Sequence, residues 1–218
     1  MNKTLLKSSK IYLYLLNKKV FSENFIYLLK FMRKKIILLI SGKGTNAINI
    51  IKYFLNSDSI QVCLVLSNNK NSPIFENLID YNVPAEYFDI ETFDDEVFEK
   101  IKKINPELIV LAGFLKKISL KFLAFFPKKI INIHPSLLPK YGGKGMYGKK
   151  IHKKVLESKD KETGITIHFV SEGYDSGEII FQKKLKINEK DEASLIEKRI
   201  HNLEYEFYPK VIASLLET

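Results

Sequence analysis

From Lys35 onward, short apolar runs alternate with stretches of helical spacing, and this alternation limits the folds open to the chain. We expect strands at residues 36–40, 60–66, 85–88, 108–112, 129–134, 164–170 and 179–185. We expect helices at residues 46–55, 73–81, 93–104, 120–126, 149–158 and 193–216, with a kink or a second helical piece near Pro209. The pattern predicts the α/β class: a Rossmann-like, mostly parallel sheet with helices on both faces. Because ligands bind at the carboxyl ends of strands in such sheets, polar residues that follow strands are candidate site residues.

The segment before this pattern, residues 1–31, holds six lysines and one glutamate and contains neither Gly nor Pro. It fits an amphipathic helix on a membrane or on the domain, or a targeting segment whose apolar run is interrupted by Lys18 and Lys19. It also fits an untranslated stretch, because Met32 stands just before the first predicted strand. We expect an N-terminal extension that is poorly ordered or precedes the true start, and one domain over residues 32–218.

The formal net charge is +10, which taken alone suggests a polyanionic partner. Only Arg33 and Arg199 among the 35 basic residues are arginines, and residues 1–31 hold half of the excess, six minus one or +5. These two points argue against a nucleic-acid partner, and we expect no membrane partner either. No apolar run reaches the roughly 18 residues of a membrane span, and a single cysteine, Cys63, argues against a disulfide framework. These features predict a reducing, cytoplasmic location.

The first predicted strand ends in a glycine-rich turn, Ser-Gly-Lys-Gly-Thr-Asn at residues 41–46. Glycines let backbone amides approach an anion, and the N-terminus of the following helix favours negative charge, so a phosphate is a natural ligand. The spacing also fits a relaxed dinucleotide fingerprint, but the second strand ends at residues 66–69 without the acidic residue that binds NAD ribose. The alternative is a plain helix-capping turn with Thr45 or Asn46 as the cap.

Two further polar elements follow predicted strands. Asn132 and His134 lie two residues apart at the end of a buried strand, so both side chains point to the same face and suit two donors aimed at one oxyanion. Asp175 follows a later strand in a loop with Gly173 and Gly177 on either side, and a carboxylate near an imidazole can relay a proton. The alternatives are a hydrogen-bonded core pair and an ordinary turn.

The remaining candidates carry weaker signals. His168 lies within a predicted strand and fits the core or a supporting position beside the site. His152 and His201 lie on predicted helices, and the four histidines show no metal-ligand spacing, so we expect no metal. Cys63 lies in the middle of an apolar strand and fits an inert core position better than a nucleophile.

In their order and in their residues, these elements resemble the phosphoribosylglycinamide formyltransferase family of purine biosynthesis. The resemblance covers about residues 34–217 and implies a formyltransferase domain over residues 32–218. The motifs that carry it are ISGKGTN at 40–46, LAGF at 111–114, INIHPSLLP at 131–139, GITIHFV at 164–170 and DSG at 175–177.

The resemblance also implies site residues, position by position. It assigns catalysis to Asn132, His134 and Asp175. It assigns ribotide binding to Gly44, Thr45, Asn46, His201, Asn202, Leu203 and Glu204. It assigns binding of the folate to Leu115, Lys116, Lys117, Ile118, Asn132, Ser171, Glu172, Gly173, Tyr174 and Asp175.

The implied reaction moves the formyl group of 10-formyltetrahydrofolate, a co-substrate, to the amine of N1-(5-phospho-D-ribosyl)glycinamide, in a monomer or weak homodimer. In it Asn132 and protonated His134 stabilise the oxyanion, while Asp175 keeps His134 charged. The chain departs from the family where residues 115–118 read Leu-Lys-Lys-Ile instead of Met-Arg-Ile-Leu. A folate deformylase and a methionyl-tRNA formyltransferase resemble the chain less well, because those families carry an additional domain before or after this one.

Overall fold

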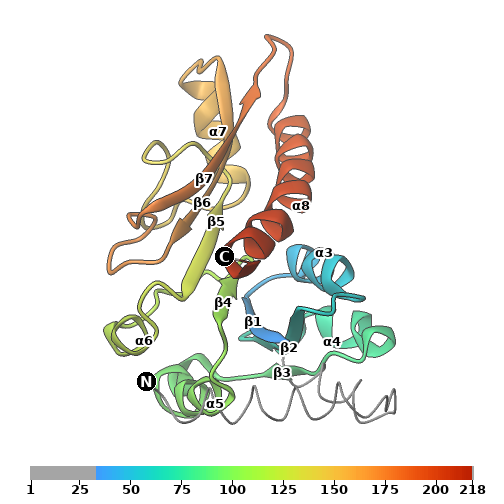
Figure 1. The fold of residues 1–218 in the computed structure, drawn as a ribbon. Coiled ribbons are helices and arrows are strands. Elements are labelled where there is room, and N and C mark those ends of the chain that lie inside the picture. Colours follow the sequence, from blue (N-terminus) through green and yellow to red (C-terminus); the bar gives the residue numbers. More distant parts are fainter. Residues whose placement is uncertain (1–32, 218) are drawn as a thin grey trace. The chain divides into compact units, whose positions relative to one another are not determined.

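A seven-stranded sheet in the order β3-β2-β1-β4-β5-β6-β7 forms the centre of the molecule (Figure 1). The computed structural model describes residues 33–217, so the expectations about residues 1–31 lie outside the described residues. Neighbouring strands from β3 to β5 are parallel, whereas β6 and β7 join antiparallel. This confirms the predicted α/β, mostly parallel sheet. The strands are β1 Lys34–Ile40, β2 Ile60–Ser67, β3 Ala85–Tyr87, β4 Leu108–Leu111, β5 Ile130–His134, β6 Glu162–Phe169 and β7 Ile179–Lys186.

The helices connect these strands close to where the sequence predicts them. They are α3 Thr45–Phe54, α4 Ile74–Asn77, α5 Phe98–Ile104, α6 Leu120–Phe125, α7 Lys149–Glu157 and α8 Ala193–Glu217. No helix among residues 33–217 combines the length and apolar character that crossing a membrane requires.

Two predicted helices have a different local geometry. The helix expected at 73–81 stops at Asn77 and continues as a 3₁₀ turn, Ile79–Tyr81, which ends where Asn82 takes a left-handed φ of 52°. The helix expected at 93–104 opens with a π turn, Phe93–Val97, before α5. The wider turn buries Phe93 and Phe98, five residues apart, on the same side of the sheet.

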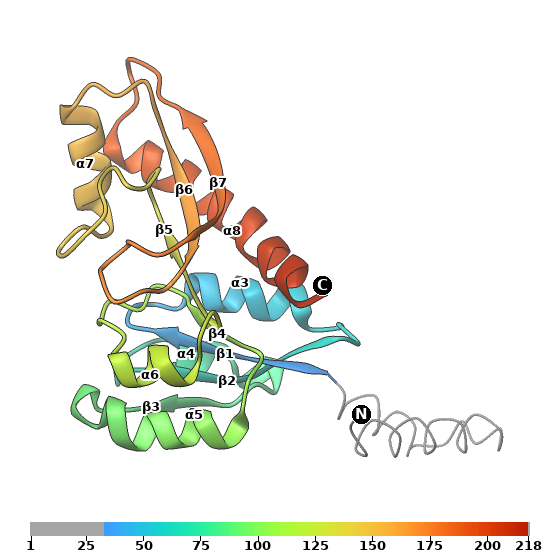
Figure 2. The same ribbon diagram turned by 60° about the vertical axis from the view of Figure 1, so that its left-hand side comes forward.

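Each face of the sheet has its own apolar core. Alternate residues of β1 divide between them: Ile36 and Leu38 face the core under α3 and α8, while Ile37 and Leu39 face the core under α5 and α6. Figure 2 shows α3 and α8 on one side of β1 and β4, with α5 on the other. The α5 side is rich in phenylalanine, and Phe93 stacks on Phe122 with ring centroids 4.6 Å apart. Helices on both faces confirm the layered fold predicted from the alternation.

Helix α8 runs without interruption through Pro209. The second helical piece that the sequence suggests at this proline is therefore not present. Proline lacks a backbone N–H and leaves the carbonyl oxygen of Tyr205, four residues earlier, without its helical donor. Asn49 of α3 supplies the missing donor, because its Nδ2 hydrogen-bonds to the Tyr205 oxygen at 2.8 Å. The two helices are thereby joined at the position where the proline weakens α8.

Tyr208 anchors α8 across the middle of the sheet. Its side chain is fully buried, and its hydroxyl lies 3.1 Å from the carbonyl oxygen of Leu111 on β4 and 3.4 Å from that of Ile131 on β5. Burial raises the pKa of Tyr208 well above its ordinary value, so the phenol stays protonated and donates. Leu111 itself, the last residue of β4, also lines the cavity described next.

Candidate active site

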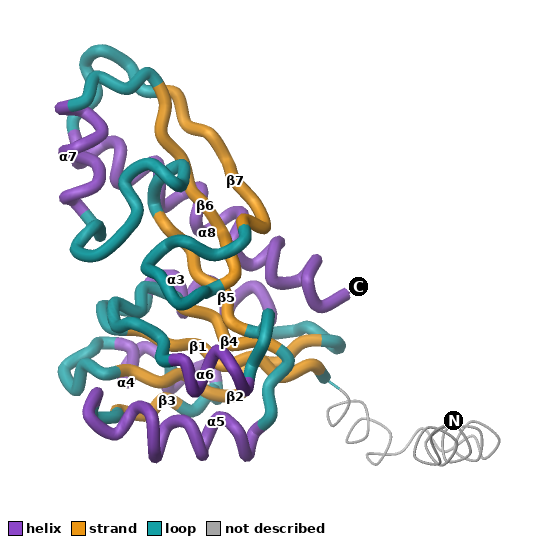
Figure 3. Tube along the Cα trace, turned by 90° about the vertical axis from the view of Figure 1, so that its left-hand side faces the viewer, coloured by secondary structure: helices purple, strands orange, loops and turns teal. Residues whose placement is uncertain are grey.

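A cavity of about 320 Å³ opens beyond the carboxyl ends of β1, β4 and β5, between the loops that follow them and helices α7 and α8. Figure 3 shows in teal the loops from which much of this wall is built. Fifteen of the residues predicted for a site line the cavity: Gly44, Thr45, Asn46, Leu115, Lys116, Lys117, Ile118, Asn132, His134, Ser171, Gly173, Tyr174, Asp175, His201 and Glu204.

Three predicted residues lie outside the cavity wall: Glu172, Asn202 and Leu203. Asn202 is exposed and Leu203 packs against the core. An α-helix turns about 100° per residue, so of these four consecutive residues only His201 and Glu204 share the face of α8 that meets the cavity, together with Glu197 one turn earlier. The structure does not bring the other two to the site.

The N-terminus of α3 forms one end of the cavity. Its N-cap is Gly44, with a left-handed φ of 75° and no side chain to cap the helix. The alternative of a capping turn centred on Thr45 or Asn46 is therefore wrong. A Cβ at residue 44 would lie 2.7 Å from Cδ1 of Ile74, so the turn needs glycine for both its conformation and its space. The first backbone amides of α3 remain available to an anion in the cavity.

A buried carboxylate stands beside this helix end. Glu204 is 4% exposed, and its Oε2 accepts hydrogen bonds from Asn46 Nδ2 at 3.0 Å and from His201 Nδ1 at 2.8 Å. The hydrogen bond to Glu204 raises the pKa of His201, against the opposing effect of partial burial. This cluster joins α3 to α8 and fixes the carboxylate at the cavity wall.

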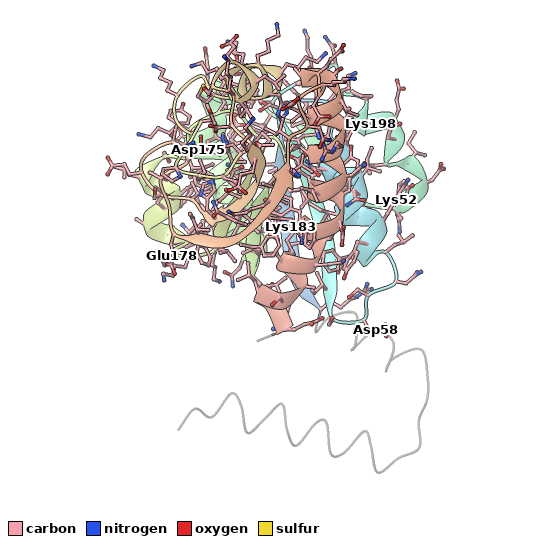
Figure 4. The ribbon with its side chains drawn as sticks, turned by 90° about the horizontal axis from the view of Figure 1, so that it is seen from above. Lys52, Asp58, Asp175, Glu178, Lys183 and Lys198 are labelled. Carbon is pink, nitrogen blue, oxygen red and sulfur yellow. The ribbon has the colours of Figure 1, made fainter. Side chains whose placement is uncertain are left out.

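In the cavity wall, Asp175 lies close to two buried histidines. Its Oδ1 is 3.5 Å from His134 Nδ1 and 3.8 Å from His168 Nε2, and Asn132 Nδ2 lies 3.3 Å from the same His168 nitrogen. Figure 4 labels Asp175, on the far side of the molecule from Lys52 of α3. The structure thus brings together all three predicted catalytic residues and adds His168 to them.

The sheet register explains this convergence. Asn132 and His134 alternate with core residues on β5, and the antiparallel register sets His168 of β6 directly opposite Asn132. Asp175 follows in a left-handed conformation, φ 52°, and its Oδ2 accepts the amide of Gly143 at 2.9 Å. The two loops after β5 and β6 therefore hold the carboxylate from both sides.

Hydrogen bonds assign the protons of His168. Its Nδ1 lies 2.8 Å from the carbonyl oxygen of Phe169 and donates to it, which leaves Nε2 to accept from Asn132. Burial lowers the pKa of His168, so the neutral form with this arrangement prevails. Because an amide nitrogen carries two hydrogens, Asn132 keeps one donor for a ligand.

Tyr141 is not among the predicted site residues, yet its backbone carbonyl orients His134. His134 Nε2 donates to the Tyr141 carbonyl oxygen at 2.8 Å, so Nδ1 is the ring nitrogen that faces Asp175. Tyr141 has a left-handed φ of 59°, and its hydroxyl donates to Asp160 Oδ2 at 3.0 Å. No periodic pattern marks an important loop carbonyl, because every residue carries this group. Only the conformation of the backbone distinguishes one carbonyl from another.

Cys63 lies away from this cavity and behaves as a core residue. Its Sγ hydrogen-bonds to the carbonyl oxygen of Ile36 at 3.3 Å, and burial raises the pKa of its thiol to about 11. Within residues 33–217, no three His, Cys, Asp or Glu side chains are grouped so that they could hold a metal ion.

Comparison with known proteins agrees with this geometry. Residues 34–212 match the formyl transferase family. The chain is 37% identical over 186 residues to the phosphoribosylglycinamide formyltransferase of Haemophilus influenzae, covering 82% of this chain and 85% of that protein. It is 36% identical over 193 residues to the chloroplastic phosphoribosylglycinamide formyltransferase of Arabidopsis thaliana, covering 85% of this chain and 66% of the relative.

A solved structure shares the fold. The crystal structure of glycinamide ribonucleotide transformylase 1 from Symbiobacterium toebii superimposes with a TM-score of 0.78 at 30% identity, covering 85% of this chain and 89% of that one. The family match spans most of the chain, and the Haemophilus relative matches over most of its own length. The chain therefore belongs to the formyl transferase family, among the phosphoribosylglycinamide formyltransferases.

Proposed function

We propose that the chain transfers the formyl group of 10-formyltetrahydrofolate to the amine of N1-(5-phospho-D-ribosyl)glycinamide. The observation that carries the proposal is the meeting of Asn132, His134 and Asp175 in one cavity that also ends at an uncapped helix N-terminus. The cavity thus offers an anion site and an oxyanion site together. The names of the relatives support the same substrates.

The ribotide occupies the α3 end in this proposal. Backbone amides at Gly44, Thr45 and Asn46 bind the phosphate, because an uncapped helix start presents free donors and a positive dipole. Glu204 accepts from the ribose hydroxyls, and its bonds to Asn46 and His201 leave it positioned to do so. Asn202 and Leu203 contribute only by holding this helical segment.

The folate occupies the opposite end, between residues 115–118 and 171–175. Ile118 is buried and Leu115 is half exposed, so the first loop offers an apolar surface to an aromatic ring system. Lys116 and Lys117 are exposed in the same loop and attract the carboxylates of the folate. Glu172 is exposed and does not line the cavity, so in this proposal it contributes through the loop backbone alone.

The chemistry is an acyl transfer between two nitrogens. The ribotide amine attacks the formyl carbon and forms a C–N bond, and the carbonyl oxygen becomes an oxyanion. Asn132 Nδ2 and the protonated Nδ1 of His134 donate to this oxyanion, and Asp175 stabilises the imidazolium. The C–N10 bond then breaks, and a proton from the amine passes to N10 of the tetrahydrofolate leaving group. Asn132, His134 and Asp175 all line the cavity.

The proposal also covers the cellular compartment and the partners of the protein. One half-buried thiol supports a reducing compartment such as the cytoplasm. The substrates are small molecules, and we propose a monomer or a weak homodimer that acts without nucleic acid.

The test is an assay of the purified protein with 10-formyltetrahydrofolate, in the presence and absence of the ribotide, following the folate product by absorbance. Product that forms only with the ribotide supports the transferase. Release of formate without the ribotide would instead identify a deformylase, and silence under both conditions would overturn the proposal.

A further inference from the structure

His152 is a buried histidine that no step above uses. It lies on α7, is 2% exposed, and lines the cavity. Neither of its ring nitrogens hydrogen-bonds to another described residue, and its Nδ1 is wholly covered. A buried polar group usually has a hydrogen-bond partner, so an unpaired imidazole at a cavity wall indicates a partner that enters the cavity. With Nδ1 enclosed, Nε2 is the nitrogen left to meet that partner.

The surroundings of His152 locate this contact within the cavity. Helix α7 packs against α8, and the titratable groups that act on His152 are Glu197, His201 and Glu204 of α8 together with His134 of β5. Three of these belong to the wall beside the α3 end, and the fourth is the catalytic histidine. His152 therefore lies close enough to both the Glu204 cluster and His134 for a ligand that contacts either to reach it.

We propose that His152 binds the ribotide by a hydrogen bond from its Nε2 to the glycinamide arm, the amide between the ribose and the reacting amine. The inference rests on the proposed function, which sets the phosphate at α3 and the amine at His134. A ribotide that spans these two points has its ribose beside Glu204. Its amide then lies between the ribose and the amine at His134. Burial lowers the pKa of His152 and so favours the neutral imidazole. A neutral ring can hydrogen-bond to a neutral amide without leaving a buried charge unpaired.

Two substitutions of similar size separate hydrogen bonding from packing. His152→Gln places an amide near the position of Nε2, whereas His152→Leu fills the space without a polar atom. We expect His152→Leu to weaken ribotide binding about tenfold, the effect of one lost hydrogen bond to a ligand, and His152→Gln to stay within about threefold of the wild type. Calorimetric titration with the ribotide measures both, and thermal melting verifies that each variant folds.

Ribose 5-phosphate is the discriminating probe, because it carries the phosphate and the ribose but no glycinamide. We expect its inhibition constant, and the KM for 10-formyltetrahydrofolate, to remain unchanged in both variants. Lys153→Ala, an exposed neighbour on α7 outside the cavity, is the matched control. Equal weakening of ribotide and ribose 5-phosphate would overturn the inference, as would normal ribotide binding by His152→Leu. If His152→Leu does not fold, a loss of more than tenfold in ribotide binding by His152→Gln overturns the inference. A wild-type protein that fails to bind the ribotide would overturn the proposed function itself.

Discussion

Asp175 combines an unusual backbone conformation with a place close to two histidines. Asparagine tolerates the same left-handed conformation and has the same shape, so Asp175→Asn removes the charge without disturbing the loop. We predict that this variant lowers kcat by about 10²–10⁴, the range for lost acid–base catalysis, while the ribotide Kd changes less than about threefold. Stopped-flow or steady-state rates with calorimetry test this; normal turnover would remove Asp175 from the catalytic group.

His201 gives a pH dependence of known sign. The bond to Glu204 raises its pKa in the folded state, so its contribution to stability is fully present below the unfolded value of about 6.5 and is lost as pH rises through the raised pKa. We predict that His201→Asn lowers the unfolding free energy more at pH 6 than at pH 9. Denaturant unfolding at both pH values measures the difference.

Lys198→Ala on the same helix is the control for this measurement, because Lys198 is exposed and outside the cavity (Figure 4). Its effect on stability is expected to be small and the same at both pH values. If His201→Asn loses the same amount of stability at pH 6 and pH 9, the stabilisation by the His201–Glu204 bond does not depend on protonation of His201.

At this scale, the sequence predicts which residues meet in the cavity better than it predicts the groups that orient them. Asn132 and His134 share a face because a strand has a period of two, a rule that needs no tertiary information. His168 joins them only through the register of β6 on β5, and Tyr141 only through a loop conformation. Such relations depend on long-range pairing, which local patterns do not contain.

Among the elements, the junction of α3 with α8 is the most specific. Asn49 compensates for the hydrogen bond that Pro209 cannot make, so the two residues act as a unit. We predict that Asn49→Ala costs about 1–3 kcal/mol of stability, because it leaves the Tyr205 carbonyl unpaired. In a Pro209→Ala background, where the helix regains its own donor, the same substitution costs less than half as much.

A double-mutant cycle by urea unfolding measures this coupling. Additive effects of the two substitutions would show that Asn49 stabilises α3 independently of the proline. Pro209 is buried, so its replacement by the smaller alanine also removes packing; the cycle cancels that contribution because it occurs in both backgrounds.

The sequence also predicts the elements well where periodicity is strong and poorly where packing decides. The apolar strands and the long helix α8 follow from pattern alone. The break after Asn77 and the π turn at Phe93–Val97 reflect how large side chains fit one particular core, and neither leaves a periodic signal. The second helical piece expected at Pro209 does not form, and a donor from another helix replaces the missing one there.

At the scale of the whole molecule, residues 34–217 by themselves form two apolar cores and line the cavity. We predict that a chain beginning at Met32 folds and keeps its activity. Its melting temperature should match that of the full chain within about 2 °C, the shift that a change near 0.5–1 kcal/mol causes in a domain of this size. Scanning calorimetry and the formyl transfer assay on both chains test this, and a large loss in the shorter chain would give residues 1–31 a structural role.

The place of α8 at the end of the described fold has a consequence for biosynthesis. A ribosome releases residues 193–217 after every other described element, yet this helix carries Glu204 to the cavity and sets Tyr208 across β4 and β5. Until then, the sheet face that α3 and α8 share lacks one of its two helices, and the cavity lacks part of its wall. Because a ligand stabilises only the state that binds it, substrate would protect finished molecules from proteolysis and leave unfinished ones to be degraded.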